Sequence, residues 1–180
     1  MTDKTKLDFE NHLHDTEARW FAIRTRFRCE KVVQKQLSSK NVTAYLPLQK
    51  HLRKWERKKK IVELPLITCY VFVKIVKADY VKVLETEHVV GFVKFSKNLI
   101  AIPEEEIDII SRVVAENIDT EILPAFLTTG QMIEIAWGRL SGIQGKLVSI
   151  EGKHSVVVEL DHIGYSLRIT VKPEWLKILK

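Results

Sequence analysis

Residues 50–75 join a strongly basic segment directly to an apolar one. Residues 50–60 carry seven Lys and Arg side chains against a single acid, Glu56. Residues 67–73, ITCYVFV, are mostly β-branched, aromatic or apolar, and this composition predicts a strand. The stretch predicts a charged hairpin arm over residues 50–60, a return strand over 61–64 and then a core strand. Such a module suits a protein that touches a polyanion and also docks on a protein.

The positive charge of the chain is concentrated in its middle. The net charge is +6 over 180 residues, yet residues 1–17 hold two Lys against five acids and residues 116–180 hold seven basic residues against eight acids. Residues 18–115 hold 20 Lys and Arg against 10 acids and therefore carry the whole excess. Neutralisation of phosphates is the usual use of a local basic excess. A solvated basic face without a ligand is the alternative interpretation.

Composition favours a soluble, cytoplasmic protein of one medium domain or two small ones. Glycine and proline are too few for a low-complexity chain. No apolar run reaches the ~18 residues of a membrane span, and the N-terminus lacks the apolar core of a signal peptide. Cys29 and Cys69 show no metal-ligand spacing, so we expect reduced thiols, no metal and no cofactor. His12 and His14 lie in residues 1–17, which we expect to be a flexible tail.

Residues 18–115 predict one α+β domain. Strands are expected at 19–26, 42–48, 67–73 and 89–95. Apolar spacing predicts an amphipathic helix over 28–39, a short helix over 79–84 and a further helix from about residue 103, where Pro103 and Glu104 suit a first turn. The expected architecture is an antiparallel sheet with flanking helices.

The remaining chain predicts a linker and a small all-β domain. Residues 116–129 are acidic, contain Pro124 and separate two segments of different charge, which is typical of a linker. From residue 130, five short strands are expected at 132–136, 146–150, 155–160, 166–171 and 175–178, with glycines in the turns between them. Such a pattern predicts a small closed SH3-like barrel over 130–180.

Both segments resemble one known family. Residues 130–150, GQMIEIAWGRLSGIQGKLVSI, look like a KOW motif whose turn glycines are Gly138, Gly142 and Gly145. RWFAIRT, an amphipathic helix, LPL, a basic hairpin, PL…YVFV, VVGFVKF and IPEEEIDII occur in the order found in the N-terminal domain of NusG-type transcription factors. The resemblance covers residues 18–180, nearly the whole chain.

The resemblance implies a bacterial, monomeric factor that binds the clamp helices of RNA polymerase and lies above the DNA. Carried over position by position, the clamp-binding residues are Ile67, Tyr70, Phe72, Phe92 and Phe95. In this family the C-terminal barrel contacts a ribosomal protein or the terminator Rho. Core packing of the same apolar residues is the competing interpretation for each of them.

Two positions depart from the family pattern. The family has Phe-Pro-Gly or Phe-Pro-Asn before the tyrosine, whereas this chain has Ile67-Thr68-Cys69, which puts the turn geometry in doubt. The specialised member RfaH carries a His-Thr-Thr-Thr run that touches a second polymerase element. The matching positions are Asp79-Tyr80-Val81-Lys82, so that contact is not carried over.

The dense basic arm favours a specialised, operon-selective antitermination regulator over a general elongation factor. It matches the side that faces the non-template DNA strand in specialised members, and a base stacked on Trp55 would contribute about 1–3 kcal/mol. Trp55 covering the apolar side of the hairpin itself is the alternative. The predicted nucleic-acid-binding residues are Arg24, Arg26, Arg28, Lys31, Lys35, Arg53, Lys54, Trp55, Arg57, Lys58, Lys59 and Lys60.

Other classes of function remain as rivals. An enzyme is disfavoured because the sequence contains no glycine-rich phosphate loop, no paired metal ligands and no nucleophile elbow. A ribosome-associated protein that binds RNA through its KOW barrel is the second rival. The β-branched residues of the C-terminal segment, including Ile133, Val156 and Ile169, favour strands over the helical hairpin that RfaH-type barrels form.

Overall fold

The structure is a computed structural model, and it describes residues 9–55, 58–118, 120–124, 130–150 and 153–179. The chain divides into two compact units. The first comprises Met1–Leu46 and Cys69–Pro103, and the second comprises Pro47–Thr68 and Glu104–Lys180. The expected division at residues 116–129 differs from this one, because the basic hairpin and the third helix are grouped with the C-terminal strands.

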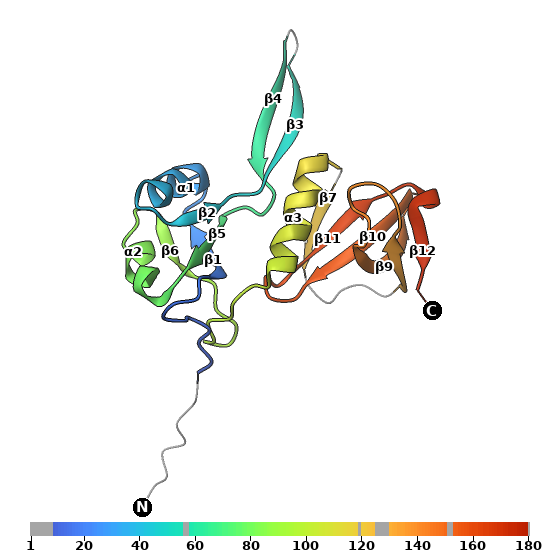
Figure 1. The fold of residues 1–180 in the computed structure, drawn as a ribbon. Helices are drawn as coiled ribbons and strands as arrows, with labels where there is room; N and C mark the ends of the chain where they lie inside the picture. Colours follow the sequence, from blue (N-terminus) through green and yellow to red (C-terminus); the bar gives the residue numbers. More distant parts are fainter. Residues whose placement is uncertain (1–8, 56–57, 119, 125–129, 151–152, 180) are drawn as a thin grey trace, which may run out of the picture. The chain divides into compact units, whose positions relative to one another are not determined.

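The first unit is built on a four-stranded antiparallel sheet in the order β2-β5-β1-β6 (Figure 1). Its strands are β1 (Arg19–Thr25), β2 (Thr43–Tyr45), β5 (Tyr70–Ile75) and β6 (Val89–Phe92). Central strands β1 and β5 pair Phe21 with Val73 and Ala22 with Phe72, and all four side chains are buried. Apolar residues on both faces of a central strand require cover on both faces. The sequence pattern of RWFAIRT and YVFVKI therefore reflects a core position.

Two helices accompany this sheet (Figure 1). Helix α1 (Glu30–Ser39) contacts β2 and β5 through a buried stripe that contains Val33 and Leu37. Helix α2 (Tyr80–Leu84) follows the 3₁₀ turn η1 (Lys77–Asp79), contacts β6 and buries Val83. The mixed fold with antiparallel sheets expected from the sequence is confirmed.

The N-terminal segment is partly ordered, so the expectation of a flexible tail over residues 1–17 is wrong for residues 9–17. Asn11 forms a parallel bridge with Leu99, and the Leu99 and His12 N–H groups donate to the Glu10 and Leu99 carbonyls, both at 2.9 Å. These are long-range backbone hydrogen bonds, which no local sequence pattern predicts.

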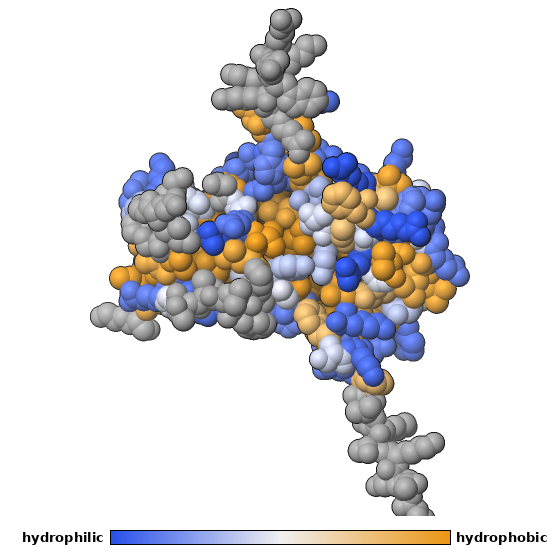
Figure 2. All heavy atoms as spheres, turned by 180° about the vertical axis from the view of Figure 1, so that it is seen from behind, coloured by the Kyte–Doolittle hydropathy of each residue, from blue (hydrophilic) through white to orange (hydrophobic). Residues whose placement is uncertain are grey.

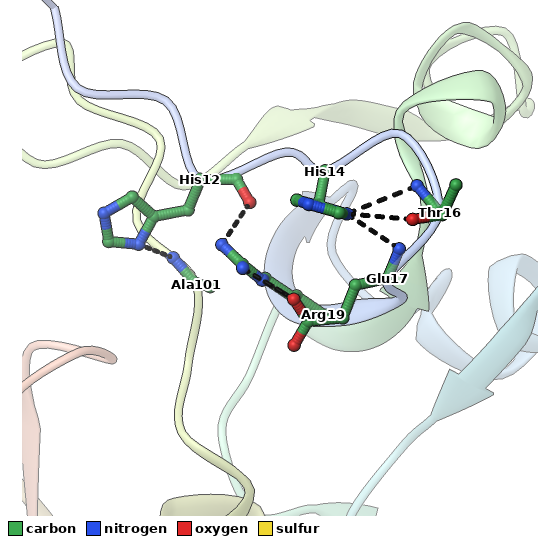
Figure 3. Close-up of polar contacts among 6 residues, drawn as sticks. All are labelled: His12, His14, Thr16, Glu17, Arg19 and Ala101. Atoms are coloured by element: carbon green, nitrogen blue, oxygen red, sulfur yellow. Dashed lines mark hydrogen bonds and ion pairs between the residues drawn. The ribbon is translucent and has the colours of Figure 1, made fainter.

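Histidines hold this segment in place (Figure 3). His12 Nδ1 accepts a hydrogen bond from the Ala101 N–H at 3.1 Å, and His14 Nδ1 accepts one from the Glu17 N–H at 2.9 Å. Arg19 donates to the Glu17 carboxylate at 2.6 Å and to the His12 carbonyl at 3.3 Å. The Arg19 side chain lowers the pKa of the Glu17 carboxyl through this hydrogen bond and its charge.

The second unit contains a hairpin, a helix and a six-stranded sheet. The hairpin is β3 (Leu48–Trp55) with β4 (Lys58–Pro65), and the helix is α3 (Glu104–Glu116). The sheet order is β12-β8-β9-β10-β11-β7. Its strands are β7 (Thr120–Pro124), β8 (Gln131–Ile135), β9 (Gln144–Ile150), β10 (Lys153–Leu160), β11 (Tyr165–Thr170) and β12 (Leu176–Ile178), with the 3₁₀ turn η2 (Pro173–Trp175) before β12.

Five of these strands lie where the sequence predicts them, and β7 is additional. Strand β7 forms within residues 116–129, which we expected to be a linker. It pairs antiparallel with β11, Glu121 lies opposite Arg168, and their carboxylate and guanidinium are 2.7 Å apart. An acidic segment therefore joins the sheet as a paired strand, and a cross-strand arginine matches the charge of Glu121.

The described helices are all too short or too polar to cross a membrane.

Candidate functional site

The first basic surface lies at the end of β1 and on α1. Its members are exposed and are Arg24, Arg26, Arg28, Lys31 and Lys35. The backbone of Arg28 is left-handed, with φ of 62°, and its guanidinium carbon lies 5.1 Å from the ring centroid of Phe27. The Phe27 side chain is 64% exposed. An exposed aromatic ring among arginines is the arrangement on which nucleic-acid bases stack.

Phe27 is absent from the residues that the sequence predicts. The alternation of basic and aromatic residues in RTRFR is the sequence signal that indicates it. Because the strand ends at Thr25, Phe27 lies in the following turn, where its ring is accessible.

The second basic surface is the β3–β4 hairpin. Its register pairs Arg53 with Lys60, Lys54 with Lys59 and Trp55 with Lys58. Two successive rungs thus pair residues of like charge, and like charges directly opposite one another destabilise a ladder. Residues Glu56 and Arg57, and the side chains of residues 53–59, lie outside the described part of the chain. A polyanion on the hairpin would remove this repulsion.

The hairpin also carries an apolar rung. Leu52 pairs with Ile61, and the two side chains are 57% and 63% exposed. Figure 2 shows apolar surface on the hairpin immediately next to its grey tip. A solvent-exposed apolar pair beside basic rungs is consistent with a ligand that has both charged and apolar parts, as single-stranded nucleic acid does.

The base of the hairpin is anchored to the end of α3. Asn117 ends the helix in a left-handed conformation, with φ of 48°, and its side-chain oxygen accepts a hydrogen bond from the Lys50 N–H at 3.0 Å. The buried Gln49 side chain donates to the Ile118 carbonyl at 2.8 Å. Asparagine is common at left-handed helix ends. The orientation of the basic arm thus depends on two amides that sequence reasoning missed.

The structure separates the predicted clamp-binding residues into two groups. Ile67, Phe72 and Phe92 are buried, with at most 9% of each residue exposed. Tyr70 and Phe95 are half-buried and present part of their rings. Phe72 packs against Tyr45 with 6.3 Å between ring centroids, and Phe92 stacks on Tyr80 at 4.7 Å. In this conformation, Tyr70 and Phe95 are the members accessible to a partner.

The turn before β5 is where the sequence departs from the family pattern, and it contains a left-handed residue. The predicted strand over residues 67–73 begins only at Tyr70, because Cys69 is left-handed with φ of 64°. The buried Glu30 carboxylate accepts the Cys69 N–H at 2.8 Å, and the Cys69 carbonyl accepts the Thr25 N–H at 2.9 Å. Burial and then the Glu30 charge raise the pKa of the Cys69 thiol.

The three predicted turn glycines meet different requirements. Gly138 and Gly142 have φ of 79° and 86°, which favour glycine. Gly145 lies so close to β10 that an added Cβ would be 2.5 Å from the Val157 carbonyl oxygen. The loop between β8 and β9 therefore depends on glycine for its backbone conformation, and the start of β9 depends on glycine for its packing against β10.

Polar contacts tie α3 to the loops of the six-stranded sheet. Arg112 donates to the carbonyls of Arg139 at 2.7 Å and Ser141 at 2.6 Å, and Glu106 lies 2.6 Å from Nδ1 of His162. A cavity of about 650 Å³ lies beside these contacts and is lined by Glu104, Glu105 and Asp108, among others. Acidic residues outnumber Arg112 among the charged residues of this lining, which disfavours phosphate in the cavity. Among the described residues, no group of His, Cys, Asp and Glu has the arrangement of a metal site.

Comparisons with known proteins place this fold in a class. Residues 18–111 match the family model of the transcription termination factor NusG. The fold resembles that of Thermotoga maritima NusG, in a structure that concerns its domain interaction, with a TM-score of 0.58 and 18% identity, covering 91% of this chain and 98% of that one. Two conformations of the MjSpt4:Spt5 complex match with TM-scores of 0.31 and identities of 19% and 21%, covering 89% of this chain and 98% and 97% of those chains. No curated protein sequence matches.

The family match defines a transcription factor. More specifically, the chain belongs to the NusG family.

Proposed function

We propose that the protein is an operon-selective transcription antitermination regulator. In this proposal the first unit binds the clamp helices of RNA polymerase, the two basic surfaces bind the non-template DNA strand, and the complex suppresses pausing and termination. Members of the family bind RNA polymerase. The six-stranded sheet is proposed to be a KOW barrel that binds a ribosomal protein or Rho.

The hairpin register is the observation that carries the DNA-binding part. Two successive like-charge rungs oppose hairpin formation in the absence of a ligand, so a protein without an anionic partner has little reason to keep them. The five exposed cations of the β1–α1 surface add a second set of phosphate contacts. A general elongation factor does not require so many basic residues in this hairpin.

Two accessible aromatic residues support the polymerase-binding part. Tyr70 begins β5 and lies opposite Arg24 of β1 in the sheet register. A partner that contacts the Tyr70 ring would therefore also be close to the exposed Arg24, at one edge of the β1–α1 basic surface. Protein and DNA contacts would then meet at adjacent positions of a single sheet.

Charge reversal in the hairpin tests the DNA role. The triple variant Lys58→Glu, Lys59→Glu and Lys60→Glu should bind a paused transcription complex more weakly. Its slope of log affinity against log salt should fall by about 2, because each lost contact to a single strand contributes roughly 0.7. A control that reverses Lys153, Lys172 and Lys177 changes the net charge equally and should bind as the wild type does. Equal binding by both variants would refute the DNA role.

Capture from a bacterial lysate tests the partner. Immobilised full-length protein should retain core RNA polymerase, and Tyr70→Ala should reduce the amount retained. A Val90→Ala variant, which truncates an exposed side chain on β6, is the matched control. Retention of ribosomal RNA without polymerase would instead identify a ribosome-associated RNA-binding protein.

A further inference from the structure

A cavity of about 400 Å³ lies in the first unit where the N-terminal segment runs beside the turn after β6. Its apolar walls are Phe9, Tyr80 and Leu99, and its other lining residues are Glu10, Asn11, Lys94 and Lys97. None of these residues belongs to the basic surfaces or to the predicted clamp-binding set. The volume falls within the range of about 300–1,000 Å³ that is typical of ligand pockets.

The turn beside this cavity has an unfavourable backbone. Phe95 and Asn98 exchange two backbone hydrogen bonds at 3.0 and 2.8 Å, while Ser96 and Lys97 have φ of 48° and 77°. Two-residue turns with two positive φ angles strongly favour Asn-Gly or similar pairs. Backbone strain that persists without glycine tends to occur where a side chain has a function. The side chain concerned is Lys97, whose Nζ lies 5.5 Å from the Phe9 ring centroid.

The cavity walls are fixed before any ligand binds. The N-terminal segment that carries Phe9 is held to Leu99 by the backbone bonds on either side of Asn11. The Tyr80 ring is stacked on Phe92 with an interplanar angle of 13°. Phe9 nevertheless remains 52% exposed. A preformed apolar pocket with an exposed aromatic wall is suited to receive an apolar side chain.

The charged residues that line the cavity are two lysines and one glutamate, which leaves a net charge of +1. Lys94 and Lys97 are exposed, and the Glu10 carboxylate, which also lines the cavity, is bonded to His12 Nε2 at 2.6 Å. His12 Nδ1 accepts the Ala101 N–H, so Nε2 carries the hydrogen and donates to Glu10. Two lysines are too few for a nucleic-acid track, which neutralises many phosphates. The apolar walls and the two lysines together match a ligand that has an apolar side chain flanked by carboxylates.

We propose that this cavity binds an acidic peptide segment of a partner protein, with one aromatic or large aliphatic residue inserted between Phe9, Tyr80 and Leu99. Carboxylates on either side of that residue would pair with Lys94 and Lys97. The binding site is separate from the basic surfaces, so its failure would leave the proposed DNA contact unaffected.

Titration of the full-length protein with fluorescein-labelled Asp-Glu-Phe-Glu-Asp tests this site. We expect saturable binding that Lys94→Glu and Lys97→Glu each weaken by about fivefold, a typical loss for one charge contact. Lys97→Gly removes the side chain while relieving the turn, so it should weaken binding although the protein is folded. Lys177→Glu, an exposed lysine on β12, should have no effect.

Two further probes test whether binding requires the apolar anchor and whether the ligand is a peptide or a nucleic acid. Asp-Glu-Ser-Glu-Asp, which lacks the apolar anchor, should bind much more weakly than the phenylalanine peptide, and Phe9→Ala should abolish that difference. Equal binding of the two peptides, or no saturation at millimolar concentration, would overturn the proposal. Binding of a five-nucleotide thymidine oligomer that depends on Lys94 and Lys97 would also overturn it, in favour of nucleic acid.

Discussion

The buried carboxylate of Glu30, on α1, accepts a hydrogen bond from the backbone N–H of Cys69 at 2.8 Å. Cys69 is left-handed, and in the family pattern this position is Gly or Asn, the residues that tolerate that conformation. The hydrogen bond from a helix 39 residues away therefore stabilises a turn that the local sequence does not favour. The start of β5, and with it the position of Tyr70, depends on this contact.

Replacing Cys69 by asparagine should stabilise the protein. Asparagine adopts the left-handed region at lower cost, and the left-handed conformation costs other residues about 1–2 kcal/mol. We expect the free energy of unfolding to rise by about 1 kcal/mol, measured by urea denaturation. Cys29→Asn, at a residue with φ of −100°, should give no comparable gain. A Cys69→Asn protein no more stable than the wild type would show that the turn is unstrained.

Removing the charge of Glu30 should increase the reactivity of Cys69. Burial and the Glu30 carboxylate raise the pKa of this thiol, so the thiolate fraction at neutral pH is small. Glu30→Gln keeps a hydrogen-bond acceptor for the Cys69 N–H but removes the charge. The pKa of the thiol should fall, and alkylation by iodoacetamide at pH 7.5, followed by peptide mass spectrometry, should become faster. An unchanged rate would assign the raised pKa to burial alone.

Gly142, in the β8–β9 loop, and Gly145, in β9, should differ in their tolerance of alanine. At Gly145 an added Cβ would meet backbone of β10, whereas at Gly142 it would meet nothing within 4 Å and only φ is unfavourable. Gly142→Ala should cost about 1 kcal/mol, and Gly145→Ala should cost about 3 kcal/mol or more. Thermal unfolding followed by circular dichroism distinguishes them. Equal losses of stability in the two variants would mean that β10 accommodates the added methyl group at no cost in free energy.

The contact between Arg19 and Glu17 should produce a specific pH dependence. Because Arg19 lowers the pKa of Glu17 in the folded protein, the contact stabilises the N-terminal segment above the ordinary glutamate pKa of about 4.3. That contribution should be lost as the pH falls through the lower folded value. The carboxyl carbon of Glu17, followed by NMR, should titrate at a lower pH in the wild type than in Arg19→Gln. Equal midpoints would show that the ion pair does not form in solution.

Local sequence patterns were sufficient for most elements of the fold. Apolar residues at helical spacing predicted α1, and short apolar or β-branched runs predicted β1 and the five strands from β8 to β12. The hairpin was predicted for a different reason, because its many charged residues cannot enter a core. The element boundaries moved by one to three residues where a left-handed residue such as Cys69 intervened.

The remaining features depend on distant partners. The order of residues 9–17 comes from hydrogen bonds to Leu99 and Ala101, and strand β7 forms by pairing with β11, where Arg168 lies opposite Glu121. The hairpin anchor joins Lys50 to Asn117, which are 67 residues apart. A single sequence does not reveal which of its polar groups will meet. For the same reason, the burial of Phe72 and Phe92 had to be read from the structure.

Strand β7 limits how far the six-stranded sheet can move from α3. With β7 paired, residues 117–119 alone join the helix to the sheet, which is a tether of about 10 Å at most. If β7 leaves β11, the connection lengthens to residues 117–130 and its maximum span rises to about 45–50 Å. The effective concentration of the sheet near α3 would fall accordingly. Pairing of the five-residue strand β7 thus sets how far from α3 a partner bound to the rest of the sheet can lie.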